Sequence, residues 1–286
     1  MQKFFVLISS FILPIFLWTL LVFYRESYVW NRISDEPTKV LILGDSHAEP
    51  IDMPKAITMA HSGDPFLMPL LHLKRYLSVA KTSDLTAVVL TVGPHNFSVL
   101  PENRLTEDAE NWLSSNGQRI ANSLSLNDYF EPPTSTITAR DYLKFEFLLL
   151  NKTINSKPIN WRDEPDLGAE IASMQSSRQR LQDKDWFVTE GSQNQVLLEL
   201  ISVCDLNHLT LVLLGTPLHQ NYLNLVEAEG WTSYRDRLHF IDSMHTNVTY
   251  LAFEELNWPD SLFKDVSHVN SKGGRTLGKM LEDLQK

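Results

Sequence analysis

Residues 40–47 read VLILGDSH, an unbroken apolar run that stops at a glycine followed by three polar residues. Such a run is typical of a strand buried on both faces of a parallel sheet, which delivers its last side chains to the carboxyl edge of that sheet. Two further predicted strands, residues 85–92 and 209–214, also stop at a glycine beside polar or turn-forming residues. Because the carboxyl ends of parallel strands share one edge, the sequence predicts a functional site there.

Helices are expected between the strands. We predict strands at residues 39–45, 56–60, 85–92, 209–214 and 248–253, and helices at residues 66–80, 193–207, 218–243 and 272–284. This alternation predicts an α/β fold in which helices cover both faces of a central parallel sheet. It stops over residues 98–185, which are richer in Ser, Asn, Thr and Glu. We interpret that segment as a helical insertion or lid over the site, whose aromatic residues line a groove or pack onto the domain.

The composition excludes some classes of protein. The 286 residues include 35 acidic and 25 basic side chains, a net charge of −10, which argues against a nucleic-acid partner. Cys204 is the single cysteine, so no intramolecular disulfide can form. No Gly-rich phosphate loop or internal repeat is found, and nothing in the sequence predicts a cofactor.

The N-terminus predicts a membrane anchor. Residues 4–24 contain no charged side chain, and a helix of that length spans a hydrocarbon core of ~30 Å. A cleaved signal peptide has a shorter apolar region and small residues at its end, whereas this stretch ends in bulky Phe23 and Tyr24. We therefore expect a retained single-pass anchor at residues 1–25, a linker at 26–38 and the α/β domain at 39–286, outside the cytoplasm.

Three residues from the two ends of the domain could form a nucleophilic site. A serine such as Ser46 becomes a nucleophile when a histidine takes its proton and an acid orients that histidine. Asp265 and His268 are three residues apart, so the carboxylate can meet one ring nitrogen while the other nitrogen faces Ser46. Each motif alone is also typical of a turn or a helix cap. Together they predict an acyl-transfer or ester-cleaving enzyme.

In these motifs the chain resembles the SGNH (GDSL-type) hydrolase superfamily of esterases and acyltransferases, from residue 39 to the C-terminus apart from the insertion. The resemblance implies a three-layer αβα, flavodoxin-like fold with Ser46 as the nucleophile and Asp265 and His268 as its partners. It also implies an oxyanion hole formed with Gly63 and Asn96. In the family's third block, however, Asn96 comes one position late and Phe97 replaces an acid. The alternatives are a turn residue for Asn96 and a purely conformational role for Gly63.

The resemblance and the predicted location together imply a substrate class. We expect action on acyl or acetyl groups of cell-envelope or exported polysaccharides, by hydrolysis or by transfer to a sugar hydroxyl. One alternative is a catalytically silent carbohydrate-binding or assembly protein that has kept the fold. Another is a lipid or thioester hydrolase at the membrane surface, which would use the same three residues.

Several histidines raise the question of a metal. The predicted site edge gathers His47, His61, His95 and His268, together with Asp45 and Asp265. These groups come from separate loops and show no His-x-x-x-His spacing, so we predict no metal site. We expect His47 to pack or hydrogen-bond beside the nucleophile. His219 and Tyr222 either contact the substrate or simply begin a helix.

Overall fold

Five parallel strands form the centre of the molecule. The computed structural model describes residues 38–79, 84–105, 191–224 and 228–284, together with residues 12, 13, 16, 17, 20, 112, 116, 120 and 226. Its strands are β1 (Val40–Gly44), β2 (Ala56–Ala60), β3 (Ala87–Val92), β4 (Thr210–Gly215) and β5 (Val248–Ala252). They pair in the order β2-β1-β3-β4-β5. This doubly wound order has its switch point between β1 and β3, where ligands characteristically bind.

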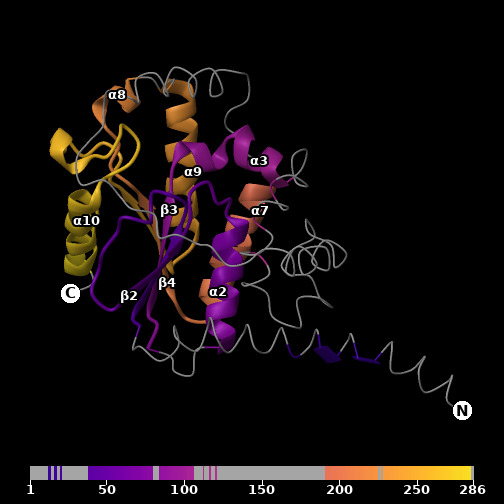
Figure 1. The fold of residues 1–286 in the computed structure, drawn as a ribbon. Coiled ribbons are helices and arrows are strands. Elements are labelled where there is room, and N and C mark those ends of the chain that lie inside the picture. Colours follow the sequence, from indigo (N-terminus) through magenta and orange to yellow (C-terminus); the bar gives the residue numbers. More distant parts are fainter. Residues whose placement is uncertain are drawn as a thin grey trace, which may run out of the picture.

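Helices connect the strands (Figure 1). They are α2 (Leu67–Val79), η1 (Pro94–Phe97), α3 (Val99–Leu105), α7 (Ser192–Leu206), α8 (Gln220–Leu223), α9 (Ala228–Met244), η3 (Asp260–Leu262) and α10 (Ser271–Leu284). The helix predicted at residues 218–243 is divided into α8 and α9. The other predicted helices and strands outside the insertion lie within two residues of the observed bounds.

Alternate side chains of the strands build one core on each face of the sheet. On one face, Leu41 and Leu213 belong to a buried cluster with Leu70 of α2, Leu200 of α7 and Leu238 of α9. Burying each such side chain contributes roughly 1.5–3 kcal/mol.

The opposite face is covered by the C-terminal helix. Ile42 and Val89 pack there with Leu277 and Leu281 of α10. Figure 1 accordingly shows α10 on one side of the sheet and α2 and α7 on the other. The predicted α/β fold, with a parallel sheet flanked by helices, is confirmed, and the arrangement is consistent with three layers.

Parts of the predicted organisation lie outside the described residues. These are the linker at 26–38 except for Thr38, most of the anchor segment 4–24, and the insertion from residue 106 onward except for three positions. In the described part of the chain, no helix has both the length and the apolar character needed to cross a bilayer. The start of the segment 98–185 is helical, as α3.

Candidate active site

Ser46, His268 and Asp265 are brought together at the carboxyl edge of the sheet. Ser46 Oγ lies 2.8 Å from His268 Nε2, and His268 Nδ1 lies 2.7 and 2.9 Å from the two carboxylate oxygens of Asp265. A hydrogen on Nδ1 satisfies the carboxylate and leaves the Nε2 lone pair facing the serine hydroxyl. The geometry is therefore that of a serine nucleophile, a histidine base and an acid that orients the base.

Ser46 is placed by the end of β1. Gly44, the last residue of the strand, has φ +143°, and a Cβ there would lie 1.9 Å from Thr91 Oγ1 on β3. Only glycine permits this conformation and this close approach of two strands. The chain then turns, with the Ala48 amide donating to the Asp45 carbonyl over 3.1 Å. Ser46 is thus presented at the switch point between β1 and β3.

The loop that carries His268 is held by its own aspartate. Asp265 Oδ1 accepts hydrogen bonds from the backbone amides of Ser267, at 3.1 Å, and of His268, at 2.6 Å. The His219 amide donates to the Val266 carbonyl over 2.9 Å, which ties the loop to the chain that follows β4. The backbone therefore fixes both partners of the Asp265–His268 pair before any substrate arrives.

The surroundings of His268 favour its neutral form. Burial lowers the pKa of His268, and the nearby His47 lowers it further, against the opposing effect of Asp265. A neutral imidazole is the form that can accept a proton from Ser46.

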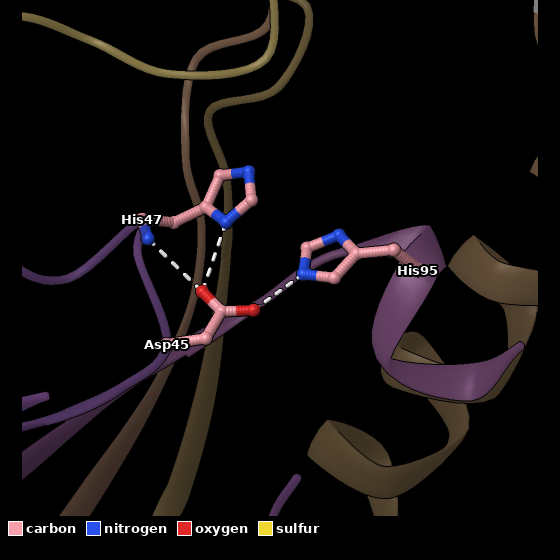
Figure 2. A group of neighbouring side chains, drawn as sticks. All are labelled: Asp45, His47 and His95. Atoms are coloured by element: carbon pink, nitrogen blue, oxygen red, sulfur yellow. Dashed lines mark hydrogen bonds and ion pairs between the residues drawn. The ribbon is translucent and has the colours of Figure 1, made fainter. Parts of the chain in front are cut away.

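Asp45, next to the serine, accepts four hydrogen bonds. The backbone amide and Nδ1 of His47 both donate to Oδ1, at 3.0 and 2.9 Å. His95 Nε2 and Asn96 Nδ2 donate to Oδ2, at 2.5 and 3.1 Å. Figure 2 shows the carboxylate held between the two histidine rings. Burial opposes ionisation of Asp45, but the two histidines outweigh it and hold its pKa well below the usual range.

Three imidazole rings are stacked beside Ser46. The centroid of the His47 ring lies 4.5 Å from that of His95 and 4.4 Å from that of His268, with interplanar angles of 21° and 26°. The expectation that His47 packs and hydrogen-bonds beside the nucleophile is confirmed. His95 was placed at this edge from the sequence, but its hydrogen bond to Asp45 was not predicted; the pattern Gly-Pro-His-Asn after a buried strand was the available signal.

Asp45, His47 and His95 offer three potential metal-ligand atoms within 4.8 Å of one another. Nδ1 of His47 and Nε2 of His95 both face the Asp45 carboxylate, one at each of its oxygens. The four donors already saturate the Asp45 oxygens, so the group fits a hydrogen-bonded network better than a metal centre.

Of the two predicted oxyanion residues, Asn96 lies in the network at the site. Its Oδ1 accepts from the Gly93 amide at 2.8 Å, and its Nδ2 donates to Asp45. The Nδ2 group carries two hydrogens, and the bond to Asp45 uses one of them. Gly63, with φ +77°, lies in the turn after β2, and its carbonyl accepts a hydrogen bond from Arg104. This contact uses the Gly63 carbonyl, whereas an oxyanion hole would use its N–H, so the predicted role of Gly63 stays a prediction.

Residues after β4 and β5 complete this edge of the sheet. Burial, together with the charge of Asp45, raises the pKa of Tyr222 to about 12. The lining of a hollow of about 220 Å³ includes His219, Gln220, Trp258 and Asp260, and the His219 amide donates to the Val266 carbonyl of the His268 loop. His219 and Tyr222, singled out from the sequence, therefore both lie near the site.

Comparison of the chain with protein-family models and with curated proteins found no match.

Proposed function

We propose that this protein is a serine-dependent ester hydrolase or O-acyltransferase of the SGNH type. One observation carries the proposal: Ser46 Oγ lies 2.8 Å from His268 Nε2, and Nδ1 of the same ring lies 2.7 Å from Asp265. The residues that resemble the family's first and last blocks therefore have the geometry that nucleophilic acyl transfer requires.

The reaction begins with attack of Ser46 Oγ on an ester carbonyl while His268 Nε2 takes the hydroxyl proton. The carbonyl oxygen becomes an oxyanion, for which the backbone amides of Ser46 and Gly63 and the second N–H of Asn96 are the proposed donors. Collapse of this intermediate breaks the ester bond, and His268 returns the proton to the departing alcohol. In the second half, His268 deprotonates water or a sugar hydroxyl, which attacks the acyl-serine and releases Ser46.

The proposed substrates are acyl or acetyl esters on cell-envelope or exported polysaccharides, with the domain anchored outside the cytoplasm. The hollow lined by His219 is compatible with a glycan, because it combines the indole of Trp258 with the polar groups of Gln220 and Asp260, beside three leucines. An indole can stack on a sugar ring, and amide and carboxylate groups can bind its hydroxyls.

Covalent labelling tests the proposal directly. A fluorophosphonate probe should label the full-length protein, and Ser46→Ala should abolish the labelling. Ser202→Ala is the matched control, because its hydroxyl is exposed on α7 and donates to the Leu198 carbonyl. Its labelling should equal that of the wild type. A folded wild-type protein that takes up no probe would contradict the proposal and favour the silent binding protein.

Turnover assays then separate the two reactions. Acetylated glycans, short acyl esters and lipids should be offered both alone and with an acceptor glycan. Release of free acid alone identifies a hydrolase, whereas acylation of the acceptor identifies a transferase. Turnover of lipids but not of glycans would contradict the proposed substrate class.

A further inference from the structure

Neither Asp45 nor His47 takes part in the proposed acylation reaction. Both side chains are buried, with exposed fractions of 3% for Asp45 and 8% for His47. They lie next to Ser46 in the sequence, and the His47 ring is stacked on the ring of His268. Burying a carboxylate and an imidazole costs folding free energy unless the two are paired and hydrogen-bonded, as they are here.

We propose that His47, held protonated by Asp45, is a built-in cation that keeps His268 neutral, and so able to accept the Ser46 proton, into mildly acidic conditions. His47 is then a positioning residue that acts through His268. The benefit of a neutral His268 rests on the proposed function, whereas the effect of His47 on the protonation of His268 does not depend on it.

The first step is that the positive charge resides on His47. Asp45 is saturated by four donors, of which only the two histidine rings can carry a charge. His47 binds Asp45 Oδ1 through both its backbone and its ring, and it also faces Asp265. The charges of His47 and Arg104 oppose a cation on His95, which is partly buried. Burial and these two charges lower the pKa of His95 against the effect of Asp45, whereas Asp45 raises the pKa of His47 against the effect of burial.

The second step is the contact between the rings of His47 and His268. Their centroids are 4.4 Å apart and the rings are stacked at 26°, so face meets face. Protonating His268 would place two cations at this distance, and a like charge so close disfavours the second protonation. Asp265 and, more weakly, Asp45 act in the opposite direction on His268. His47 therefore offsets the tendency of Asp265 to hold His268 protonated and unreactive.

The test is a direct titration of the histidine rings in the full-length chain. In His47→Asn, the amide nitrogen occupies the place of Nδ1, so the hydrogen bond to Asp45 is kept while the ring and its charge are lost. Long-range ¹H–¹⁵N NMR of histidine-labelled protein should show the pKa of His268 rising by about one pH unit. The pH at which Ser46 labelling is half-maximal should rise equally. His208→Asn is the matched control, because it is exposed and has φ +56°, which asparagine tolerates.

An unchanged or lower pKa of His268 in a folded His47→Asn protein overturns the inference. If that variant fails to fold, the same NMR titration of the wild-type protein tests the inference, which requires His268 to titrate at a lower pH than His47. The reverse order overturns the inference. The titration needs no turnover, so a shifted His268 in a protein that takes up no probe would refute the proposed enzyme and leave this electrostatic coupling standing.

Discussion

At the scale of single residues, two aspartates organise two histidines in the same way. Asp265 binds the backbone amide and the ring of His268, and Asp45 binds the backbone amide and the ring of His47. In each pair the hydrogen bond from the backbone amide holds the carboxylate in place. The hydrogen bond between the carboxylate and the ring therefore costs less conformational entropy. The difference lies at the far nitrogen, because His268 directs Nε2 at a serine hydroxyl.

The pH dependence of acylation follows from His268. Its pKa is lowered from 6.5 by burial and by His47. Because the neutral ring is the base, the rate should rise as pH increases through this lowered pKa and then level off. We expect half of the maximal rate of Ser46 acylation by p-nitrophenyl acetate to be reached below pH 6.5. Stopped-flow measurement of the p-nitrophenol burst checks this, and a midpoint above 6.5 would contradict it.

Substitutions of the two partners of Ser46 should differ in size. His268→Ala removes the base, and we expect kcat/KM to fall by about 10⁶-fold, whereas Asp265→Asn should cost about 10⁴-fold because the base is kept but poorly oriented. The double variant should lose little more than His268→Ala alone, since members of one catalytic unit are strongly non-additive. Ester turnover by the purified variants measures this. Independent, additive losses would argue against a shared mechanism.

The sequence predicted some of these contacts and not others. Asp265 and His268 are three residues apart in one loop, so their pairing is a local property that spacing can indicate. The stack of His47 on His95 and His268 joins three separate loops, and it depends on the ring orientations that tertiary packing sets. For the same reason the contact of Gly63 with Arg104, 41 residues away, could not be predicted from a turn motif.

At the scale of elements, α10 reaches the serine loop through glycines. A Cβ on Gly274 would lie 1.7 Å from the Pro50 carbonyl oxygen, and one on Gly278 would lie 1.9 Å from that of Asp52. The helix therefore touches the backbone of the segment that follows Ser46. Because α10 begins three residues after His268, this contact also sets the distance between the two halves of the site.

Gly274→Ala should consequently destabilise the protein although alanine favours helices. We expect a loss of about 1–3 kcal/mol in the free energy of unfolding, because the methyl group forces α10 away from Pro50. Arg275→Ala, exposed on the same helix, is the control and should change stability by less than about 0.5 kcal/mol. Urea unfolding followed by circular dichroism measures both. Equal stability of the two variants would show that the helix can shift without cost.

Periodicity predicted the strands and most of the helices because each buries a long apolar face. It did not predict the break between α8 and α9. The break follows Leu223, where Asn224 is the C-cap of α8. At the other end of α8, His219 accepts a hydrogen bond from the Asn221 amide and pairs with Asp260, 41 residues distant, so the local sequence could not indicate how this helix begins.

At the scale of the whole molecule, topology gathers the site. Ser46, Asn96 and His268 are separated by long stretches of chain, but each follows a strand or loop that ends at the same edge of the parallel sheet. The alternation of strands and helices predicted that shared edge. The order of the strands is not contained in the alternation, because it depends on where each connection crosses the sheet.

The described strands and both cores are drawn from residues 38–284, which predicts that the domain folds without the first 37 residues. A chain of residues 38–286 should unfold cooperatively and bind a fluorophosphonate probe at Ser46 as the full-length protein does.

The full-length protein and this shorter chain should differ in location. The uncharged stretch at residues 4–24 should bring the full-length protein into the membrane fraction, where alkaline carbonate does not extract it, while the shorter chain stays in the supernatant. Full-length protein released by carbonate would contradict the anchor and leave the fold unaffected, whereas a shorter chain that fails to unfold cooperatively would show that the N-terminal residues contribute to the core.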